Sequence, residues 1–233
     1  MIPDLSDRDP DLRELMDDPD CDLSQLRRTY EQFRVVNRAL ARWRWVYVRL
    51  IRPLLQPDRT VTLLDIGCGG GDVAHALARW AAHDNLRLSI TAVDPDERAY
   101  AFATAQRVTS GVRFRRASSA DLVAEGATYD IVVSNHLLHH LDQATLAGLL
   151  ADSQRLARRL VVHNDIARSR LAYLAYALVS RPFGRRSFVH VDGLLSIRRS
   201  YRRDELAAAA GAPWQVQTAF PARLLLVAGS GTI

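Results

Sequence analysis

The sequence predicts an α/β protein with a mostly parallel sheet that is covered by helices on both faces. Two observations support this fold class. Short apolar runs alternate with segments of helical periodicity from residue 62 onward. A glycine-rich turn follows the first of these runs at residues 67–71. A buried parallel strand that ends in such a turn presents backbone N–H groups to a nucleotide-like ligand.

The N-terminal region is expected to be helical after an irregular start. Residues 1–22 are rich in aspartate and show little periodicity, so we expect an extended or partly disordered arm. Asp22 is a suitable N-cap, and apolar residues at helical spacing follow it. They predict helices over residues 23–41 and 42–55. We therefore assign residues 1–57 to an N-terminal arm and helical cap.

The remaining residues, 58–233, are expected to form the sheet domain. Seven strands are predicted at residues 62–66, 88–93, 112–115, 130–133, 160–162, 214–218 and 223–227. Helices are predicted at residues 73–83, 96–108, 143–156 and 203–210. A helical insert is predicted after the fifth strand at about residues 168–195.

Composition limits the class of protein. The chain has 233 residues, of which 48% are hydrophobic, and this suits one globular domain with a full core. The sequence has no run of about 18 apolar residues, so no membrane span is predicted. The polar first seven residues do not resemble a secretory signal, and the two cysteines are too few for a disulfide framework. We expect a cytoplasmic location; the oligomeric state is left open.

All basic residues are arginines, and the formal net charge is +5. The absence of lysine excludes a lysine base or Schiff-base nucleophile. The arginine pairs are scattered along the chain and form no basic stripe with interleaved aromatic residues. Nucleic acid is therefore not the expected partner.

Polar side chains gather where the predicted strands end. The six residues at or just past these ends are Asp65, Asp94, Asn135, His136, His163 and Asp165. Solvated loops would explain one or two of them but not the whole set. Because ligands of open α/β sheets bind beyond the carboxyl ends of the strands, we expect these residues to mark the ligand site.

The glycine-rich turn indicates the kind of ligand. Asp65 precedes Gly67, Gly69 and Gly71 in a pattern that resembles the first motif of class I S-adenosylmethionine (SAM)-dependent methyltransferases. A carboxylate there is unfavourable for a pyrophosphate and suits a cationic amine or sulfonium. The dinucleotide fingerprint G-x-G-x-x-G is the near alternative, but Asp72 stands where it needs Gly or Ala. The resemblance implies a Rossmann-like, seven-stranded sheet and SAM as cofactor.

Further cofactor contacts are expected after the second and third strands. Asp94, followed by Pro95, stands where a ribose-binding carboxylate belongs in SAM and NAD enzymes alike. The alternative role for Asp94 is a helix N-cap. Many methyltransferases have an adenine-binding Asp after the third strand. Here Ser118 or Ser119 takes that place, or Asp121 does so through a shifted loop.

The segment 129–141 resembles the fourth-strand motif of small-molecule class I methyltransferases. This resemblance places Asn135 and His136 beside the methionine part of the cofactor. His139 and His140 would begin the next helical turn, where either can reach the substrate. Nucleic-acid amino-methyltransferases usually have Asn/Asp-Pro-Pro-aromatic at this position, and the chain departs from that pattern.

Two further segments are expected to contact the acceptor. Residues 30–44 resemble the helices that cap the pocket of ubiquinone/menaquinone C-methyltransferases, although Glu31-Gln32 departs from that family's Asp. The insert at 168–195 is apolar with flanking arginines. It would form a lid over a lipophilic acceptor, a peripheral contact with a membrane surface, or a plain buried helix.

Together these features predict methyl transfer from SAM to a small aromatic, phenolic or quinone-like acceptor at oxygen or carbon, with S-adenosylhomocysteine (SAH) as product. The candidate bases are His136, His139, His140 and His190, with Asp165 as the residue that orients one of them. This scheme requires no metal, since the histidines lack the spacing of a zinc site. The alternatives are a nucleic-acid or protein methyltransferase and a nicotinamide-dependent oxidoreductase.

Overall fold

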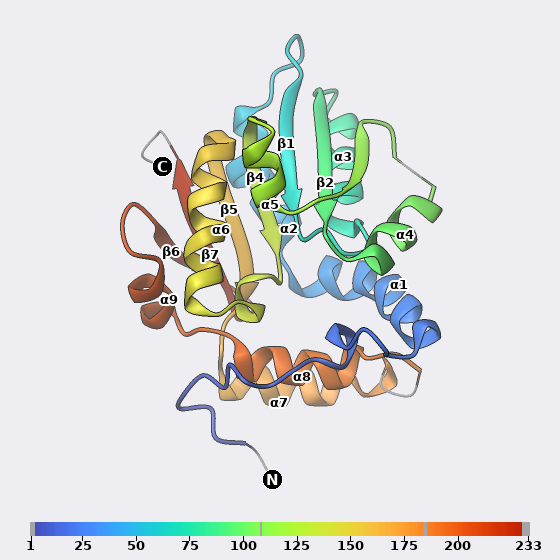
Figure 1. Ribbon diagram of the computed structural model, residues 1–233, viewed down its shortest axis with the longest axis vertical. Coiled ribbons are helices and arrows are strands. Elements are labelled where there is room, and N and C mark those ends of the chain that lie inside the picture. The colour runs from blue at the N-terminus through green and yellow to red at the C-terminus, as the bar shows by residue number, and fades with distance from the viewer. Residues whose placement is uncertain (1–2, 108, 184–185, 230–233) are drawn as a thin grey trace.

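The computed structural model describes residues 3–107, 109–183 and 186–229. It contains a seven-stranded sheet in the order β3-β2-β1-β4-β5-β7-β6. The first five strands run parallel, and β7 is antiparallel to both of its neighbours. The predicted α/β class, with its mostly parallel sheet, is confirmed (Figure 1).

Each predicted strand is present. The strands are β1 (Val61–Ile66), β2 (Leu88–Asp94), β3 (Val112–Arg116), β4 (Tyr129–Asn135), β5 (Ala157–Ile166), β6 (Gln215–Ala219) and β7 (Arg223–Gly229). β5 extends four residues beyond its predicted end because β7 pairs with it as far as Ile166. Residues 163–165, expected at or just past the end of this strand, are part of its last four positions.

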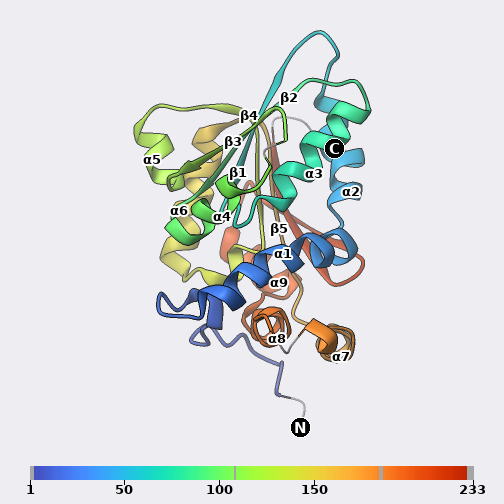
Figure 2. The same ribbon diagram turned by 90° about the vertical axis from the view of Figure 1, so that its right-hand side faces the viewer.

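Helices cover both faces of the sheet. They are α3 (Asp72–His83), α4 (Glu97–Ala105), α5 (Ser119–Ala124), α6 (Gln143–Leu156) and α9 (Arg203–Ala210). α3 packs on one face, and α5, α6 and α9 contribute to the core on the other (Figure 2). The short helix α5 was not predicted from the sequence. α4 ends at Ala105, and its predicted end, Val108, lies outside the described residues.

The N-terminal region folds against the sheet domain. α1 (Leu23–Leu40) is followed by α2 (Trp43–Val46), a π-helical turn (Tyr47–Ile51) and a 3-10 turn (Arg52–Leu54). Arg42 interrupts the two predicted helices with a φ of 57°. Several apolar residues of the second segment share one core with β1 and α3. The domain boundary after residue 57 stays a prediction.

The arm before α1 is extended, as expected, apart from a 3-10 turn (Leu15–Asp17), and it runs along α8 (Figure 1). Hydrogen bonds connect the described residues of the arm to the sheet domain and to the insert. Arg8 donates to the carbonyl oxygens of His139 and Arg199. The backbone N–H groups of Leu15 and Met16 donate to the Asp192 carboxylate at 2.8 and 3.0 Å.

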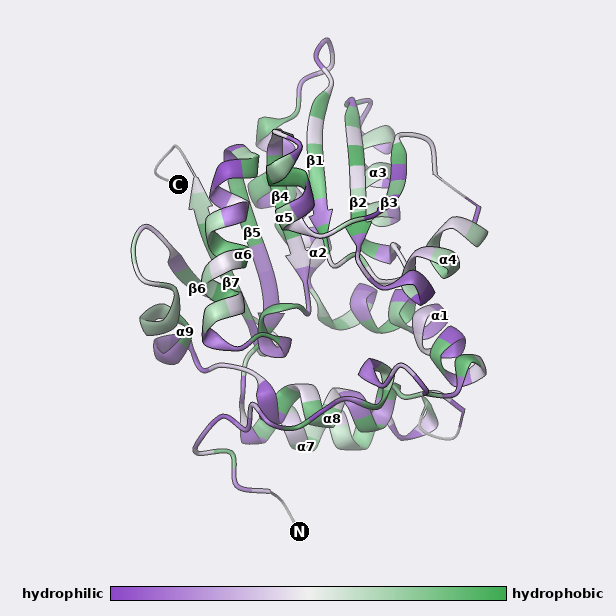
Figure 3. Ribbon diagram, viewed as in Figure 1, coloured by the Kyte–Doolittle hydropathy of each residue, from purple (hydrophilic) through white to green (hydrophobic). Residues whose placement is uncertain are grey.

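The insert after β5 forms α7 (Arg170–Val179), a 3-10 turn (Arg181–Phe183) and α8 (Val189–Arg199). Both helices lie beyond the ends to which the parallel strands point (Figure 1), and both carry hydrophobic residues (Figure 3). No residue of α7 is fully buried, so the alternative of a plain buried helix was wrong. Within the described ranges, no helix is both long and apolar enough to cross a membrane.

Candidate active site

A cavity of about 560 Å³ lies where the carboxyl ends of β1, β2 and β4 meet α1, the arm and the insert. This volume is typical of small-molecule sites. The predicted site residues that line it are Asp65, Gly67, Gly69, Asp94, Pro95, Asn135, His136, His139 and His140. The predicted residues outside the lining are Gly71, Ser118, Ser119, His163, Asp165 and His190.

The glycine loop is bound to the end of β2. Gly69 has a φ of 51°, a conformation that glycine adopts without steric cost. Its backbone N–H donates to Oδ2 of Asp94 at 2.8 Å. Gly71, with a φ of 76°, has a different role: a Cβ there would lie 2.5 Å from the ring of Phe114. Gly71 therefore permits close packing behind the loop, and it does not line the cavity.

Asp65 is an isolated buried acid. It is 1% exposed, and neither of its carboxylate oxygens has a hydrogen-bond partner among the described residues. Burial, together with the nearby charges of Asp72 and Asp94, raises the pKa of Asp65 well above its usual value. Burial of an unpaired carboxylate is costly. Since Asp65 lines the cavity, the site fits a ligand that brings a positive charge to it.

Asp94 is held in a fixed orientation at the cavity wall. Its two oxygens accept backbone N–H bonds from Gly69 and Asp96, and burial raises its pKa. The N-cap of α4 is Asp96, whose side chain accepts from the N–H of Arg98. The alternative that Asp94 itself caps this helix was therefore wrong.

A buried arginine organises the polar ends of β4 and β5. Arg223 is 3% exposed and donates to Asn135 Oδ1, Asn164 Oδ1 and His136 Nε2. Burial lowers the pKa of Arg223 to about 10. Asn135 Oδ1 also accepts from Trp43 Nε1 at 3.0 Å. The sequence interpretation missed Arg223, and its signal was an arginine at the start of an otherwise apolar strand.

His136 is oriented by this arginine. It has a φ of 54°, which is uncommon for a residue other than glycine and is typical of functional sites. Burial and the charge of Arg223 lower the pKa of His136 well below its usual value. The imidazole is therefore neutral at pH 7, and its Nε2 is the acceptor of the Arg223 N–H at 3.1 Å.

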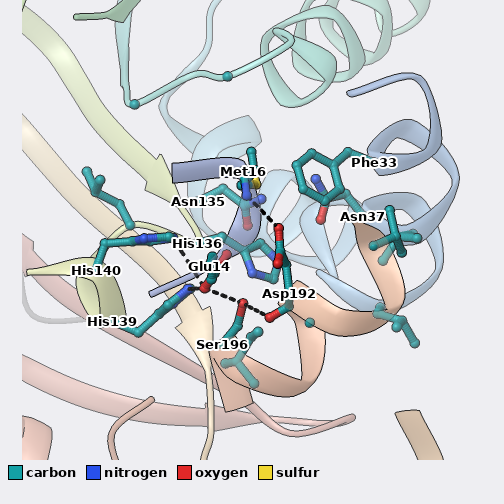
Figure 4. A pocket seen from close by; sticks show the side chains of 18 of the residues that line it. Glu14, Met16, Phe33, Asn37, Asn135, His136, His139, His140, Asp192 and Ser196 are labelled. Atoms are coloured by element: carbon teal, nitrogen blue, oxygen red, sulfur yellow. Dashed lines mark hydrogen bonds and ion pairs between the residues drawn. The ribbon is translucent and has the colours of Figure 1, made fainter. Parts of the chain in front are cut away.

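His139 lies between two carboxylates. Its Nδ1 is 2.6 Å from Asp165 Oδ1, and its backbone N–H donates to Asp165 Oδ2. On the other side of the ring, Nε2 lies 3.2 Å from Glu14 Oε1 (Figure 4). Burial opposes a charge on His139, but Asp165 and Glu14 outweigh it and raise the pKa to about 9. The prediction that Asp165 orients one of the histidines agrees with this geometry.

Two acidic residues of the N-terminal arm, Glu14 and Asp17, line the cavity. Glu14 is 4% exposed and accepts a hydrogen bond from Ser196 Oγ at 2.7 Å. His140 Nε2 lies 3.7 Å from Glu14 Oε1, and His140 Nδ1 lies 3.1 Å from Asp17 Oδ2. The sequence interpretation missed both acids, because they belong to an arm without periodicity. We call Glu14, His139 and His140 the Glu–His cluster.

Three other candidates have partners away from the cavity. His190 Nδ1 lies 2.7 Å from Ser180 Oγ. Ser118 caps α5 in a reciprocal pair with Asp121, and Ser119 donates to Asp152. The adenine contact, by Ser118, Ser119 or Asp121, stays a prediction.

Residues 63–159 match the family model of the methyltransferase domain. The ubiquinone biosynthesis O-methyltransferase of Caulobacter vibrioides is 34% identical over 88 residues, which are 36% of this chain and 32% of that protein. The enzyme of the same name from Rhizobium etli is 31% identical over 93 residues, covering 39% and 35% of the two chains. The chain thus spans about a third of the length of these relatives.

Solved structures share the fold at low sequence identity. Human N-acetylserotonin methyltransferase in complex with SAM superposes with a TM-score of 0.63 at 12% identity, over 91% of this chain and 57% of that one. A putative O-methyltransferase from Nostoc punctiforme gives a TM-score of 0.54 at 18% identity, over 86% and 60%. Residues 63–159 therefore carry a methyltransferase domain, and the sheet has the fold of these solved methyltransferase structures.

Proposed function

We propose that the protein binds SAM at the glycine loop and transfers its methyl group to the hydroxyl oxygen of a small aromatic or quinone-like acceptor. The observation that carries this proposal is the shared cavity. Its lining includes both the unpaired acid Asp65 and the Glu–His cluster, which would form the acceptor end. A cationic donor and a hydroxyl acceptor could therefore be held in one cavity, and holding the two reactants together is the main requirement of an in-line displacement.

The cofactor half of the cavity fits SAM. Asp65 is a buried acid without a hydrogen-bond partner among the described residues. SAM carries a sulfonium and an ammonium group, and a positive charge beside Asp65 would favour its ionised form. Asp94, oriented by Gly69, offers carboxylate oxygens to the ribose hydroxyls. Bound SAM supplies the electrophilic methyl group, whereas the protein supplies position and a site with little water.

The acceptor half of the cavity combines apolar walls with one polar cluster. The apolar part of its lining includes Phe33, Val36, Val179 and Ile197. These side chains suit a flat lipophilic ring, and the cluster beside them can accept the proton of a ring hydroxyl. In the transfer the O–H proton leaves, an O–CH₃ bond forms, the S–CH₃ bond breaks, and SAH departs as a neutral thioether.

Relatives support oxygen as the acceptor atom, since the Caulobacter and Rhizobium proteins are named O-methyltransferases. A nicotinamide cofactor is disfavoured, because Asp65 and Asp72 both lie at the loop that would have to hold its pyrophosphate.

Calorimetric titration tests the proposal directly. The chain is titrated with SAH and, separately, with NADH, and transfer from labelled SAM to a panel of phenols and hydroquinones is then measured. We expect SAH to bind, NADH not to bind, and label to appear on lipophilic hydroxyl compounds. Binding of NADH without binding of SAH would refute the proposal.

A further inference from the structure

We propose that Glu14, His139 and His140 bind a divalent transition-metal cation of the zinc class at the acceptor end of the cavity. Its ligands would be a carboxylate oxygen of Glu14 and Nε2 of each histidine. Ligand atoms of these three residues lie within 4.8 Å of one another. The catalytic role of the cation rests on the proposed function, whereas its binding does not.

The distances from Glu14 to the two histidines fit tetrahedral coordination. Glu14 Oε1 lies 3.2 Å from His139 Nε2 and 3.7 Å from His140 Nε2. Zinc bonds to nitrogen and oxygen of about 2.0–2.1 Å at tetrahedral angles separate ligand atoms by about 3.4 Å. The two distances from Glu14 are therefore close to those of a tetrahedral site. Some catalytic zinc sites also use two histidines and one glutamate as ligands and leave a fourth coordination position open.

The second ring nitrogen of each histidine supports the same assignment. His139 Nδ1 lies 2.6 Å from Asp165, and His140 Nδ1 lies 3.1 Å from Asp17. A carboxylate on Nδ1 fixes the tautomer that leaves the Nε2 lone pair free for a metal, and it makes that nitrogen a better ligand. A simple ion pair between Glu14 and one histidine would not require both rings to be oriented in this way.

The remaining surroundings complete the site. Ser196 Oγ donates to Glu14 and fixes its carboxylate. The two residues after Glu14 donate their backbone N–H groups to the Asp192 carboxylate, which holds this part of the arm in place. Glu14, His139 and His140 all line the cavity, so an open coordination position would face the acceptor. A cation there would bind the acceptor hydroxyl oxygen and lower its pKa, which favours the nucleophilic form.

The test is metal binding by the full chain after removal of metal with a chelator. We expect one Zn²⁺ per chain by elemental analysis, and Co²⁺ to give the visible absorption of a tetrahedral site. Glu14→Gln and His140→Asn should each weaken Zn²⁺ binding at least tenfold. Asp17→Asn, which removes a partner of a ligand, should weaken it less. The matched control is His83→Asn, because His83 is exposed at the end of α3, and this variant should bind Zn²⁺ normally.

SAH binding is measured for every variant, because it shows whether the variant is folded and whether the cofactor half of the cavity is intact. Two outcomes would refute the metal site. The first is SAH binding with less than one Zn²⁺ per chain, and the second is a His83→Asn variant that loses as much Zn²⁺ affinity as His140→Asn. Neither outcome would contradict the proposed function. If the wild-type chain binds Zn²⁺ as expected but does not bind SAH, the proposed function fails and the metal site stands.

Discussion

The backbone N–H of Gly69 donates to the carboxylate of Asp94 at 2.8 Å, joining the glycine loop to the end of β2. Two segments that lie 25 residues apart in the sequence are thereby fixed relative to each other. A second N–H, from Asp96, holds the other carboxylate oxygen. The ribose-binding side of the proposed cofactor site is therefore formed before any ligand arrives.

Asp94→Ala should weaken SAH binding at least tenfold, because it removes the acceptor for the ribose hydroxyls and releases the loop. Calorimetry measures the dissociation constant. Glu97→Ala is the matched control, since Glu97 lies three residues further on and its side chain is 74% exposed. Unchanged affinity in Asp94→Ala would show that the ribose binds elsewhere.

Asp65→Asn should weaken SAM binding and stabilise the ligand-free chain. Because the pKa of Asp65 is raised in the folded state, the folded chain retains a proton that the unfolded chain releases. The free energy of unfolding therefore falls as pH rises above the unfolded pKa of about 4. Asparagine has no such titration, so the gain in stability of Asp65→Asn should be larger at pH 7 than at pH 5.

Urea denaturation at the two pH values measures this difference. Asp58→Asn, a change at an exposed position before β1, should show no such pH dependence. A loss of stability in Asp65→Asn that is equal at both pH values would contradict the assignment of an unpaired acid.

His139→Asn should lower the rate of methyl transfer at least a hundredfold while SAH affinity is retained. The change removes the ring that holds Glu14, the carboxylate that would accept the proton, and positioned acid–base groups contribute about 10²–10⁴ in rate. His190→Asn should change the rate little, because this ring contacts Ser180 outside the cavity lining. Rates under saturating SAM compare the two variants. Equal losses in both would show that the acceptor does not bind near His139.

Gly71→Ala should destabilise the chain by about 1–3 kcal/mol, the usual cost of overpacking. Its Cβ would lie 2.5 Å from the Phe114 ring, at a backbone φ of 76°. Gly148→Ala in α6 is the control: nothing lies within 4 Å of its Cβ, and alanine favours helix. Urea denaturation of both variants should therefore give changes of opposite sign, and a stable Gly71→Ala variant would mean that Phe114 moves freely.

Sequence patterns predicted the parts of the site that depend on local structure. Asp65, Gly69 and Asp94 were found because strand ends and glycine turns are recognisable within a few residues. Glu14 was missed because its position depends on contacts with residues more than a hundred positions away, His139 and Ser196. Such contacts leave no periodic signal in an irregular arm.

The extent of β5 escaped prediction for a related reason. Its last four residues show no alternation of apolar and polar side chains and include His163 and Asp165, so they do not resemble a strand. Their backbone is fixed by pairing with β7, which is about 60 residues further along the chain. Arg223 begins that partner strand, and its buried position follows from the same pairing.

The route of the arm over the acceptor end has a practical consequence. Residues 63–159 identify the domain, yet residue 14 forms part of the wall that would touch the acceptor. A shortened protein that begins at α1 would retain Asp65, the glycine loop and Asp94, and it should pass every assay of cofactor binding. It would also lack Glu14, so screening such a protein for substrates would return false negatives.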